Sequence, residues 1–136
     1  MDTSKIRRDH DALFAGIDAL RALMQAGVAE NADAISGELG KLSATIRLHL
    51  SIEDRMLYPA LANAANPDIA AAGKRFRQDM GGLAEAYRTF ATRWNARARI
   101  AADPDGFRRE ADAVFEALHA RIQHETRELL PLVEQV

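Results

Sequence analysis

The stretch HLSIEDRMLYP, from His49 to Pro59, closes a long apolar segment with a histidine and a glutamate four residues apart. At about 100° per residue, positions four apart in an α-helix lie on nearly the same side. His49 and Glu53 therefore share one side of a helix. The apolar residues Ile46 and Met56 are expected on that side too, facing the protein interior. An imidazole and a carboxylate in the interior need partners, because burying an unpaired charge is costly.

Apolar residues recur at three- and four-residue steps in four segments of the chain, which is the pattern of amphipathic helices. The residues that begin or end helices also fit this pattern. Glycine and proline stand where the segments are expected to break, at Gly27, Pro59, Pro67 and Pro104. Short connections between long helices predict an all-α, antiparallel, up-down-up-down four-helix bundle. We expect one domain over residues 1–136, with helices at about residues 4–26, 33–58, 68–99 and 104–131.

Composition narrows the classes of function. The 136 residues are 48% apolar and contain no cysteine, so any metal site must use nitrogen and oxygen ligands. Eighteen basic and 20 acidic residues are interspersed, without a basic stripe or an apolar run of membrane-spanning length. We therefore expect a cytoplasmic monomer or homodimer that binds neither nucleic acid nor membrane. No serine–histidine pair or phosphate-binding loop indicates catalysis, so we do not expect an enzyme.

Polar side chains from several predicted helices fall at one level of this bundle. In an antiparallel arrangement the start of the first helix lies beside the end of the second, the start of the third and the end of the fourth. His10, on the inward line of the first helix, therefore reaches the layer of His49 and Glu53. The third and fourth helices bring the following residues to that layer: Asp79, Met80, Arg121 and Glu125. Imidazole and carboxylate groups on facing helices are typical ligands of iron, manganese or zinc.

The second and fourth segments repeat one another. Aligned on their prolines, HLSIEDRMLYP and RIQHETRELLP (residues 121–131) place Glu53 over Glu125 and His49 over Arg121. The repeat therefore predicts a second inward glutamate, with an arginine where a second histidine would stand.

Two other histidines of the fourth helix are weaker candidates. His124 and Glu128 form another histidine–glutamate pair, but His124 points roughly 140° from the centre of the apolar face. We expect it on the surface. His119 lies about 80° from that centre and is at most a marginal ligand.

Three pieces of sequence together resemble a known family. They are RRDHDALF around His10, HLSIEDRMLYP, and the glutamate Glu125 six residues before Pro131. The chain resembles the hemerythrin-like, HHE cation-binding family of four-helix bundles. The resemblance implies a non-haem iron pair held by histidines and carboxylates, in proteins that bind oxygen, sense oxygen, iron or redox state, or assist nitrosative-stress repair. The residues that match ligand positions of the family are His10, His49, Glu53 and Glu125.

The third helix contains no histidine, where the family supplies one or two. The fourth helix has Arg121 where the repeat predicts a histidine. A reduced site is therefore expected rather than a full iron pair. In one arrangement the four matching residues hold a single metal ion, with positions left for water, oxygen or nitric oxide. Iron is the first expectation, and zinc or manganese would also fit. Arg121 would then pair with a carboxylate outside the ligand set.

Two further arrangements are open. In a metal-free layer, the guanidinium of Arg121 pairs with Glu53 and Glu125, and the bundle acts as a regulatory or interaction module. In a two-metal site, additional ligands or charge partners come from the residues near the layer: Asp54, Asp79, His119 and Met80.

Overall fold

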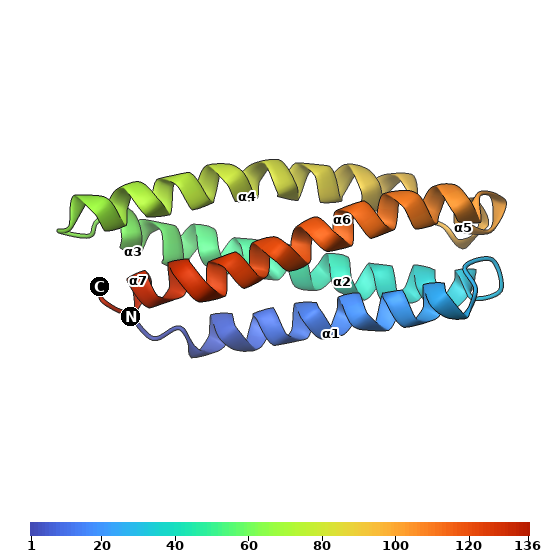
Figure 1. Ribbon diagram of the computed structural model, residues 1–136, viewed down its shortest axis with the longest axis horizontal. Coiled ribbons are helices and arrows are strands. Elements are labelled where there is room, and N and C mark those ends of the chain that lie inside the picture. The colour runs from blue at the N-terminus through green and yellow to red at the C-terminus, as the bar shows by residue number, and fades with distance from the viewer.

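The computed structural model describes residues 1–136 and consists of helices and short connections (Figure 1). Four long rods lie side by side, and successive rods run in opposite directions (Figure 1). The predicted all-α fold is therefore confirmed. The rods are α1 (Ser4–Ala26), then α2 (Ala32–Ile52) with η1 (Glu53–Leu57) and α3 (Tyr58–Ala62), then α4 (Pro67–Arg93), and finally α6 (Pro104–His124) with η2 (Glu125–Leu129) and α7 (Leu130–Val133). A short helix, α5 (Arg97–Ala102), lies between the third and fourth rods.

Local sequence explains where these helices begin and end. The side chain of Asn66 accepts a hydrogen bond from the Asp68 amide at 2.9 Å, and that of Asp103 accepts one from the Gly106 amide at 3.0 Å. Each cap precedes a proline at the first helical position, where a missing N–H costs nothing. Gly27 ends α1 with a φ of 132°, a conformation that favours glycine.

The third rod is shorter than predicted. We expected a helix to residue 99, but α4 ends at Arg93 and the chain turns at Trp94. The turn buries the indole, whose ring packs edge-on against Phe107 with centroids 5.5 Å apart. The indole N–H also donates to Glu110 of α6. The third rod therefore ends at a large side chain that is buried against α6.

The second rod does not end at Pro59, as the sequence suggested. It passes through a π-helical turn, in which the amide of Tyr58 donates to the carbonyl of Glu53 five residues before it. A proline ring crowds the carbonyl four residues earlier, and the wider turn lets the helix continue past it. Because of the wider turn, the prediction that Met56 faces the interior is wrong. Met56 is 58% exposed, and Leu57 is fully buried in its place. The fourth rod contains the same turn at Glu125–Leu129, before Pro131.

Two apolar clusters fill the interior, and a polar layer separates them. The larger cluster includes Leu13, Ile46 and Ile122, and the smaller one includes Ile6 and Leu57. His10 follows Ile6 and precedes Leu13 on the buried side of α1. The core is thus divided at the level where the polar residues of the other rods also lie.

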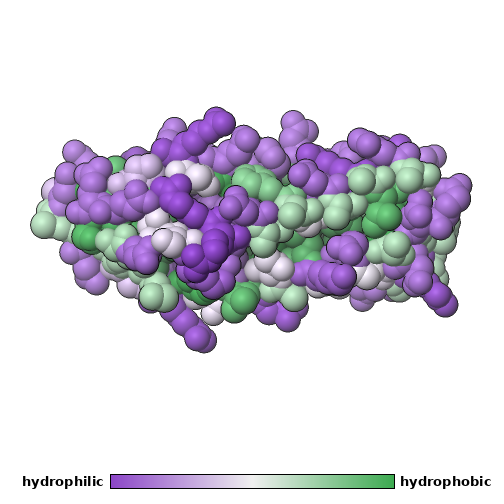
Figure 2. Space-filling model, turned by 90° about the horizontal axis from the view of Figure 1, so that it is seen from below, coloured by the Kyte–Doolittle hydropathy of each residue, from purple (hydrophilic) through white to green (hydrophobic).

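The visible surface mixes polar and hydrophobic side chains (Figure 2). On the face shown in Figure 2, hydrophilic side chains surround smaller hydrophobic areas. The large hydrophobic side chains that are exposed are Leu48, Met56 and Val136. No helix combines the length and the apolar character needed to cross a bilayer.

Candidate metal centre

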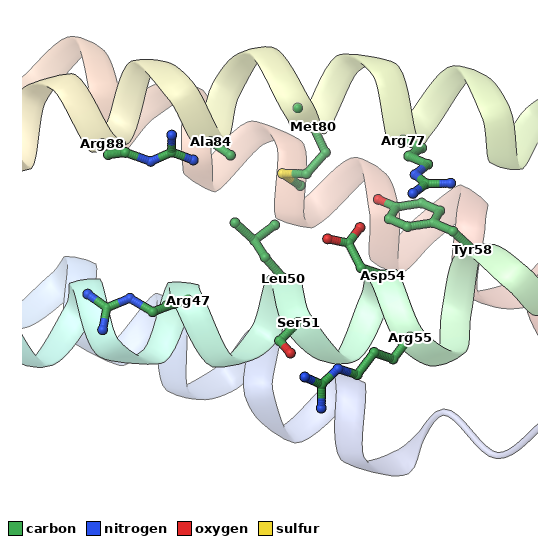
Figure 3. Close-up of a pocket in the computed structure, with 11 residues that line it drawn as sticks. Arg47, Leu50, Ser51, Asp54, Arg55, Tyr58, Arg77, Met80, Ala84 and Arg88 are labelled. Atoms are coloured by element: carbon green, nitrogen blue, oxygen red, sulfur yellow. The ribbon is translucent and has the colours of Figure 1, made fainter.

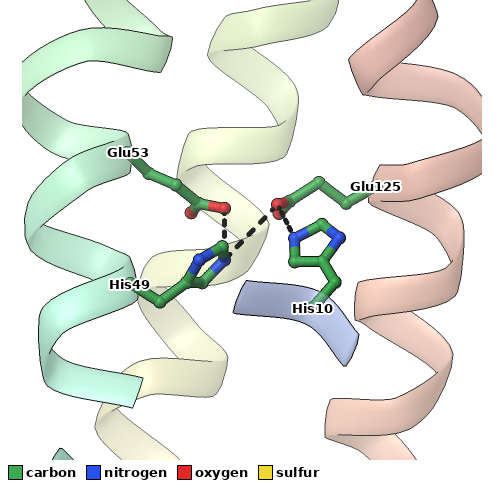
Figure 4. A group of neighbouring side chains, drawn as sticks. All are labelled: His10, His49, Glu53 and Glu125. Atoms are coloured by element: carbon green, nitrogen blue, oxygen red, sulfur yellow. Dashed lines mark hydrogen bonds and ion pairs between the residues drawn. The ribbon is translucent and has the colours of Figure 1, made fainter. Parts of the chain in front are cut away.

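Four ionisable side chains meet in the polar layer (Figure 4). They are His10 of α1, His49 of α2, Glu53 at the start of η1 and Glu125 at the start of η2, and we call them the His/Glu cluster. Each offers one ligand atom, and these atoms all lie within 4.8 Å of one another. All four residues are buried, and both glutamates are fully inaccessible. The structure thus brings together the four residues selected from the sequence, and their role as ligands remains a prediction.

The contacts within the cluster join histidine nitrogens to carboxylate oxygens. His10 Nε2 lies 2.9 Å from Glu125 Oε1, and His49 Nε2 lies 2.7 Å from Glu53 Oε1. His49 Nε2 is also 3.6 Å from Glu125 Oε1. The two imidazole rings pack edge to face, with centroids 4.9 Å apart. Every ring nitrogen and carboxylate in these contacts faces a common point (Figure 4).

A threonine fixes the orientation of His10. The hydroxyl of Thr126 donates to the carbonyl of Ile122 at 2.9 Å, so its oxygen is left to accept from His10 Nδ1 at 2.7 Å. Because Nδ1 bonds to Thr126, Nε2 is the nitrogen of His10 that faces the cluster and would bind a metal ion. Hydrogen bonds of this kind set the tautomer of histidines that bind metals.

The cluster binds a proton at His49 strongly. Burial alone would lower the pKa of this imidazole, but the neighbouring Glu125 and Glu53 carboxylates raise it to about 10. The imidazolium of His49 therefore supplies a positive charge among the carboxylates at neutral pH.

The two glutamates differ in protonation. Burial and the adjacent Glu125 raise the pKa of Glu53 to about 8. Burial acts on Glu125 in the same direction, but hydrogen bonds from Glu53, His10 and His49 keep its pKa well below the usual value. Two adjacent buried carboxylates cannot both ionise easily, so the pair shares one proton, held on Glu53. The Tyr58 hydroxyl donates to Glu53 Oε2 at 3.3 Å.

The chemistry of the cluster fits a metal ion. His49 Nδ1 and Glu125 Oε2 are buried without any hydrogen-bond or ion-pair partner, while His49 Nε2 and Glu53 Oε1 meet at 2.7 Å. Buried polar atoms are normally paired, so the two atoms without a partner need an explanation. Two imidazoles and two carboxylates form a nitrogen and oxygen ligand set suited to iron, manganese or zinc. None of the four residues comes from α4.

Arg121 does not take the position suggested from the sequence. Its guanidinium donates to the carbonyl of Phe76 at 3.0 Å and lies 4.3 Å from the centroid of that ring. It also lies 3.5 Å from the exposed carboxylate of Asp79. The expectation that Arg121 pairs with the two buried glutamates is therefore wrong. Its long side chain reaches past the layer to α4, where the ring and the carbonyl stabilise it.

The other candidates lie outside the cluster. Asp79 serves as the charge partner of Arg121, and Asp54 is exposed. His119 packs on Phe14, with ring centroids 4.6 Å apart. Met80 is buried, but it lines a groove between α2 and α4. The structure therefore places neither aspartate nor His119 where a second metal would need them.

The surface assignment of His124 and Glu128 is confirmed. These residues pair with each other, and 44% and 64% of their side-chain surfaces are exposed. Sequence reasoning missed two neighbours of the cluster, Thr126 and Tyr58. The signal for Thr126 was its place directly after Glu125 and four residues after Ile122, where a threonine hydroxyl bonds back to the helix.

A comparison with protein families agrees with the helical fold. The model of the Hemerythrin HHE cation binding domain matches residues 1–133. The chain belongs to the hemerythrin HHE cation-binding family. No individual curated protein and no solved structure matches it significantly. The buried His/Glu cluster of this hemerythrin-like chain is consistent with the cation binding for which the family is described.

Proposed function

We propose that this hemerythrin-like protein holds one non-haem metal ion, iron in the first place, at His10, His49, Glu53 and Glu125. The observation that carries the proposal is the convergence of four buried ligand atoms within 4.8 Å, from three of the four rods. Bringing such groups together without a cation is unfavourable, because each loses its hydration. A bound ion would compensate both carboxylates.

The proposed role is the binding or sensing of a small ligand, such as oxygen or nitric oxide, or of iron or redox state. Iron supplies redox chemistry and affinity for diatomic ligands when it is bound. The protein supplies two imidazoles and two carboxylates, and Thr126 orients His10 through Nδ1. The apolar clusters on both sides of the layer limit access of water. Zinc or manganese would fit the same ligand types.

The test is to express the protein with iron available and to measure metal per chain together with the ultraviolet-visible spectrum. We expect about one ion per chain, since the ligand set can surround one ion only. Replacing His49 or Glu53 with alanine removes a ligand and is expected to abolish stoichiometric binding.

The chain offers a matched control for these variants. His124 and Glu128 form the same histidine–glutamate pair at a spacing of four residues, but on the surface. Their alanine variants are expected to retain the metal. Purified wild type without iron, manganese or zinc, or equal losses in the buried and surface variants, would contradict the proposal.

One observation favours a second candidate, a metal-free bundle that acts as a regulatory or interaction module. The imidazolium of His49, with a pKa of about 10, lies against Glu53 and Glu125 and compensates their charge without a metal. This layer uses histidines and glutamates without the arginine expected from the sequence. The metal measurement separates the two candidates, because the metal-free bundle predicts no bound ion.

A further inference from the structure

A groove on the molecular surface carries an excess of positive charge. It lies between the second rod and α4 and has a volume of about 620 Å³ (Figure 3). Four arginines line it: Arg47, Arg55, Arg77 and Arg88. The single acidic side chain among its lining residues is Asp54. We call this feature the arginine groove.

The positive charges of the arginine groove are poorly compensated by the protein. Arg88 pairs with Glu85 at 2.9 Å, but no carboxylate lies within ion-pair distance of Arg47, Arg55 or Arg77. The only charged-group interaction of Arg77 is with the ring of Tyr58, 5.9 Å away. The whole chain has a net charge of −2, so the groove is positively charged although the protein as a whole is slightly negative.

Other hollows on the surface differ in this respect. One of them combines Arg21 and Arg108 with Asp112 and Glu116, so its charges balance. Two positive and two negative side chains offer no preference for an anion. Two hollows that adjoin the arginine groove are exceptions: one shares Arg47 and Arg88 with it and the other shares Arg77, and no acidic side chain lines either, so they extend its excess of cations.

The centre of the arginine groove is mostly apolar, with the Asp54 carboxylate pointing into it (Figure 3). Leu50, Met80 and Ala84 contribute apolar surface, and the ring of Tyr58 lies beside them. Arg47 and Arg88 lie together at one end, while Arg77 lies near Tyr58 toward the other (Figure 3). Cationic groups at separated positions thus flank an apolar centre.

We propose that the arginine groove binds an organic anion with acidic groups at two separated positions on an apolar body. Guanidinium groups pair with carboxylate, sulfonate or phosphate oxygens through charge-assisted hydrogen bonds. The apolar centre accommodates the body of such a molecule, and 620 Å³ is within the size range of small-molecule sites. The Asp54 carboxylate repels a ligand whose negative charge extends along the whole groove. A ligand whose acidic groups are held apart is therefore favoured. None of the four metal-ligand candidates lines the groove, but Tyr58 touches both the groove and Glu53, so anion binding is measured with and without a metal.

The test uses 2,6-naphthalenedisulfonate as the probe, a rigid planar body with a sulfonate at each end. Binding to the full chain is measured by calorimetry and by amide chemical shifts at low ionic strength, with and without added iron. We expect a dissociation constant below about 1 mM and shifts centred on residues of the groove. The monosulfonate 2-naphthalenesulfonate is expected to bind at least about fivefold more weakly, and inorganic sulfate more weakly still.

Charge-reversal variants locate the site. Arg47→Glu and Arg77→Glu are each expected to weaken binding about tenfold or more, since each removes a charged hydrogen-bond donor. Arg109→Glu is the matched control, because Arg109 is an exposed arginine of α6 without an ion pair. All three positions are exposed, and circular dichroism establishes that the variants remain folded. Absence of disulfonate binding at millimolar concentration, equal binding of sulfate, or equal losses in the control and groove variants would overturn the proposal. A protein that binds the probe but no metal would contradict the proposed function alone.

Discussion

Metal binding at the His/Glu cluster is expected to release about two protons near pH 7. His49 and Glu53, with pKa values of about 10 and about 8, both carry a proton in the metal-free protein at that pH. A metal ion requires both groups to lose it. At pH 7, which is 3 units below the pKa of His49 and 1 unit below that of Glu53, removing both protons costs about 5 kcal/mol in total. The apparent affinity should therefore rise about 100-fold from pH 6 to pH 7, and about tenfold per unit near pH 9.

The assay is calorimetric titration with Zn²⁺, which fits the ligand set and does not change oxidation state. Measurements in buffers of different ionisation enthalpy give the number of protons released per ion. A competing chelator of known affinity extends the range of dissociation constants that can be measured.

The variant Glu53→Gln tests the assignment of the two protons. Unlike alanine, the amide keeps an oxygen that can face the ion, so zinc should still bind, more weakly than to the wild type. The amide carries no titratable proton, so release per bound ion should fall from about two protons to about one, and the pH dependence should fall to about tenfold per unit. Zinc binding in the wild type with no proton release, or with an affinity that is flat between pH 6 and pH 8, would refute the reasoning.

Three further predictions concern the fold and the surroundings of the site. Gly82→Ala is expected to stabilise α4 by about 0.5–1 kcal/mol, because no atom lies within 4 Å of the added carbon, whereas Gly73→Ala should destabilise it by about 1–3 kcal/mol, because the added carbon would lie 2.7 Å from a leucine Cβ of α3; thermal unfolding measures both. Thr126→Val should weaken metal binding about 10- to 100-fold, while Thr45→Val, which removes the same kind of hydroxyl–carbonyl bond away from the cluster, should leave it unchanged. The raised pKa of His49 stabilises the metal-free fold fully below pH 6.5, and this stabilisation is lost as the pH rises toward 10. The raised pKa of Glu53 acts in the same direction, so urea unfolding should show a loss of about 3 kcal/mol from His49 and about 2 kcal/mol from Glu53 between pH 6.5 and pH 9; a stability that rises over this range would contradict the assignment.

The sequence predicted the parts of the site that depend on helix periodicity. His10, His49 and Glu53 lie on continuous apolar lines, and the internal repeat selected Glu125. Short side chains in a regular helix point where the backbone directs them, so their convergence follows from spacing and antiparallel packing.

The parts that were predicted incorrectly depend on long side chains or on departures from the regular helix. Arg121 starts on the inward side of α6, but its flexible chain allows the guanidinium to reach Phe76 instead of the carboxylates. Met56 was placed in the interior by α-helical arithmetic, which does not hold across a π turn. The chain leaves the helix at Trp94 although the apolar spacing continues, so periodicity alone did not show where α4 ends. The glutamate six residues before a proline, present in both segments, is the sequence feature that accompanies the π turns.

Each π turn also has a consequence for insertions and deletions. An additional residue in one helical turn rotates everything beyond it by about 100° relative to a continuous α-helix. In the second rod this rotation brings Leu57 and Leu61 into the smaller apolar cluster while His49 and Glu53 keep their place above it. Deleting one residue between Glu53 and Pro59 would therefore leave both ligand candidates in register and turn the apolar end of the rod toward solvent. At each of the two glutamates the helix turns its following residues to a new side. The number of residues between each glutamate and the next proline is therefore constrained more tightly than the choice of apolar residue within that segment.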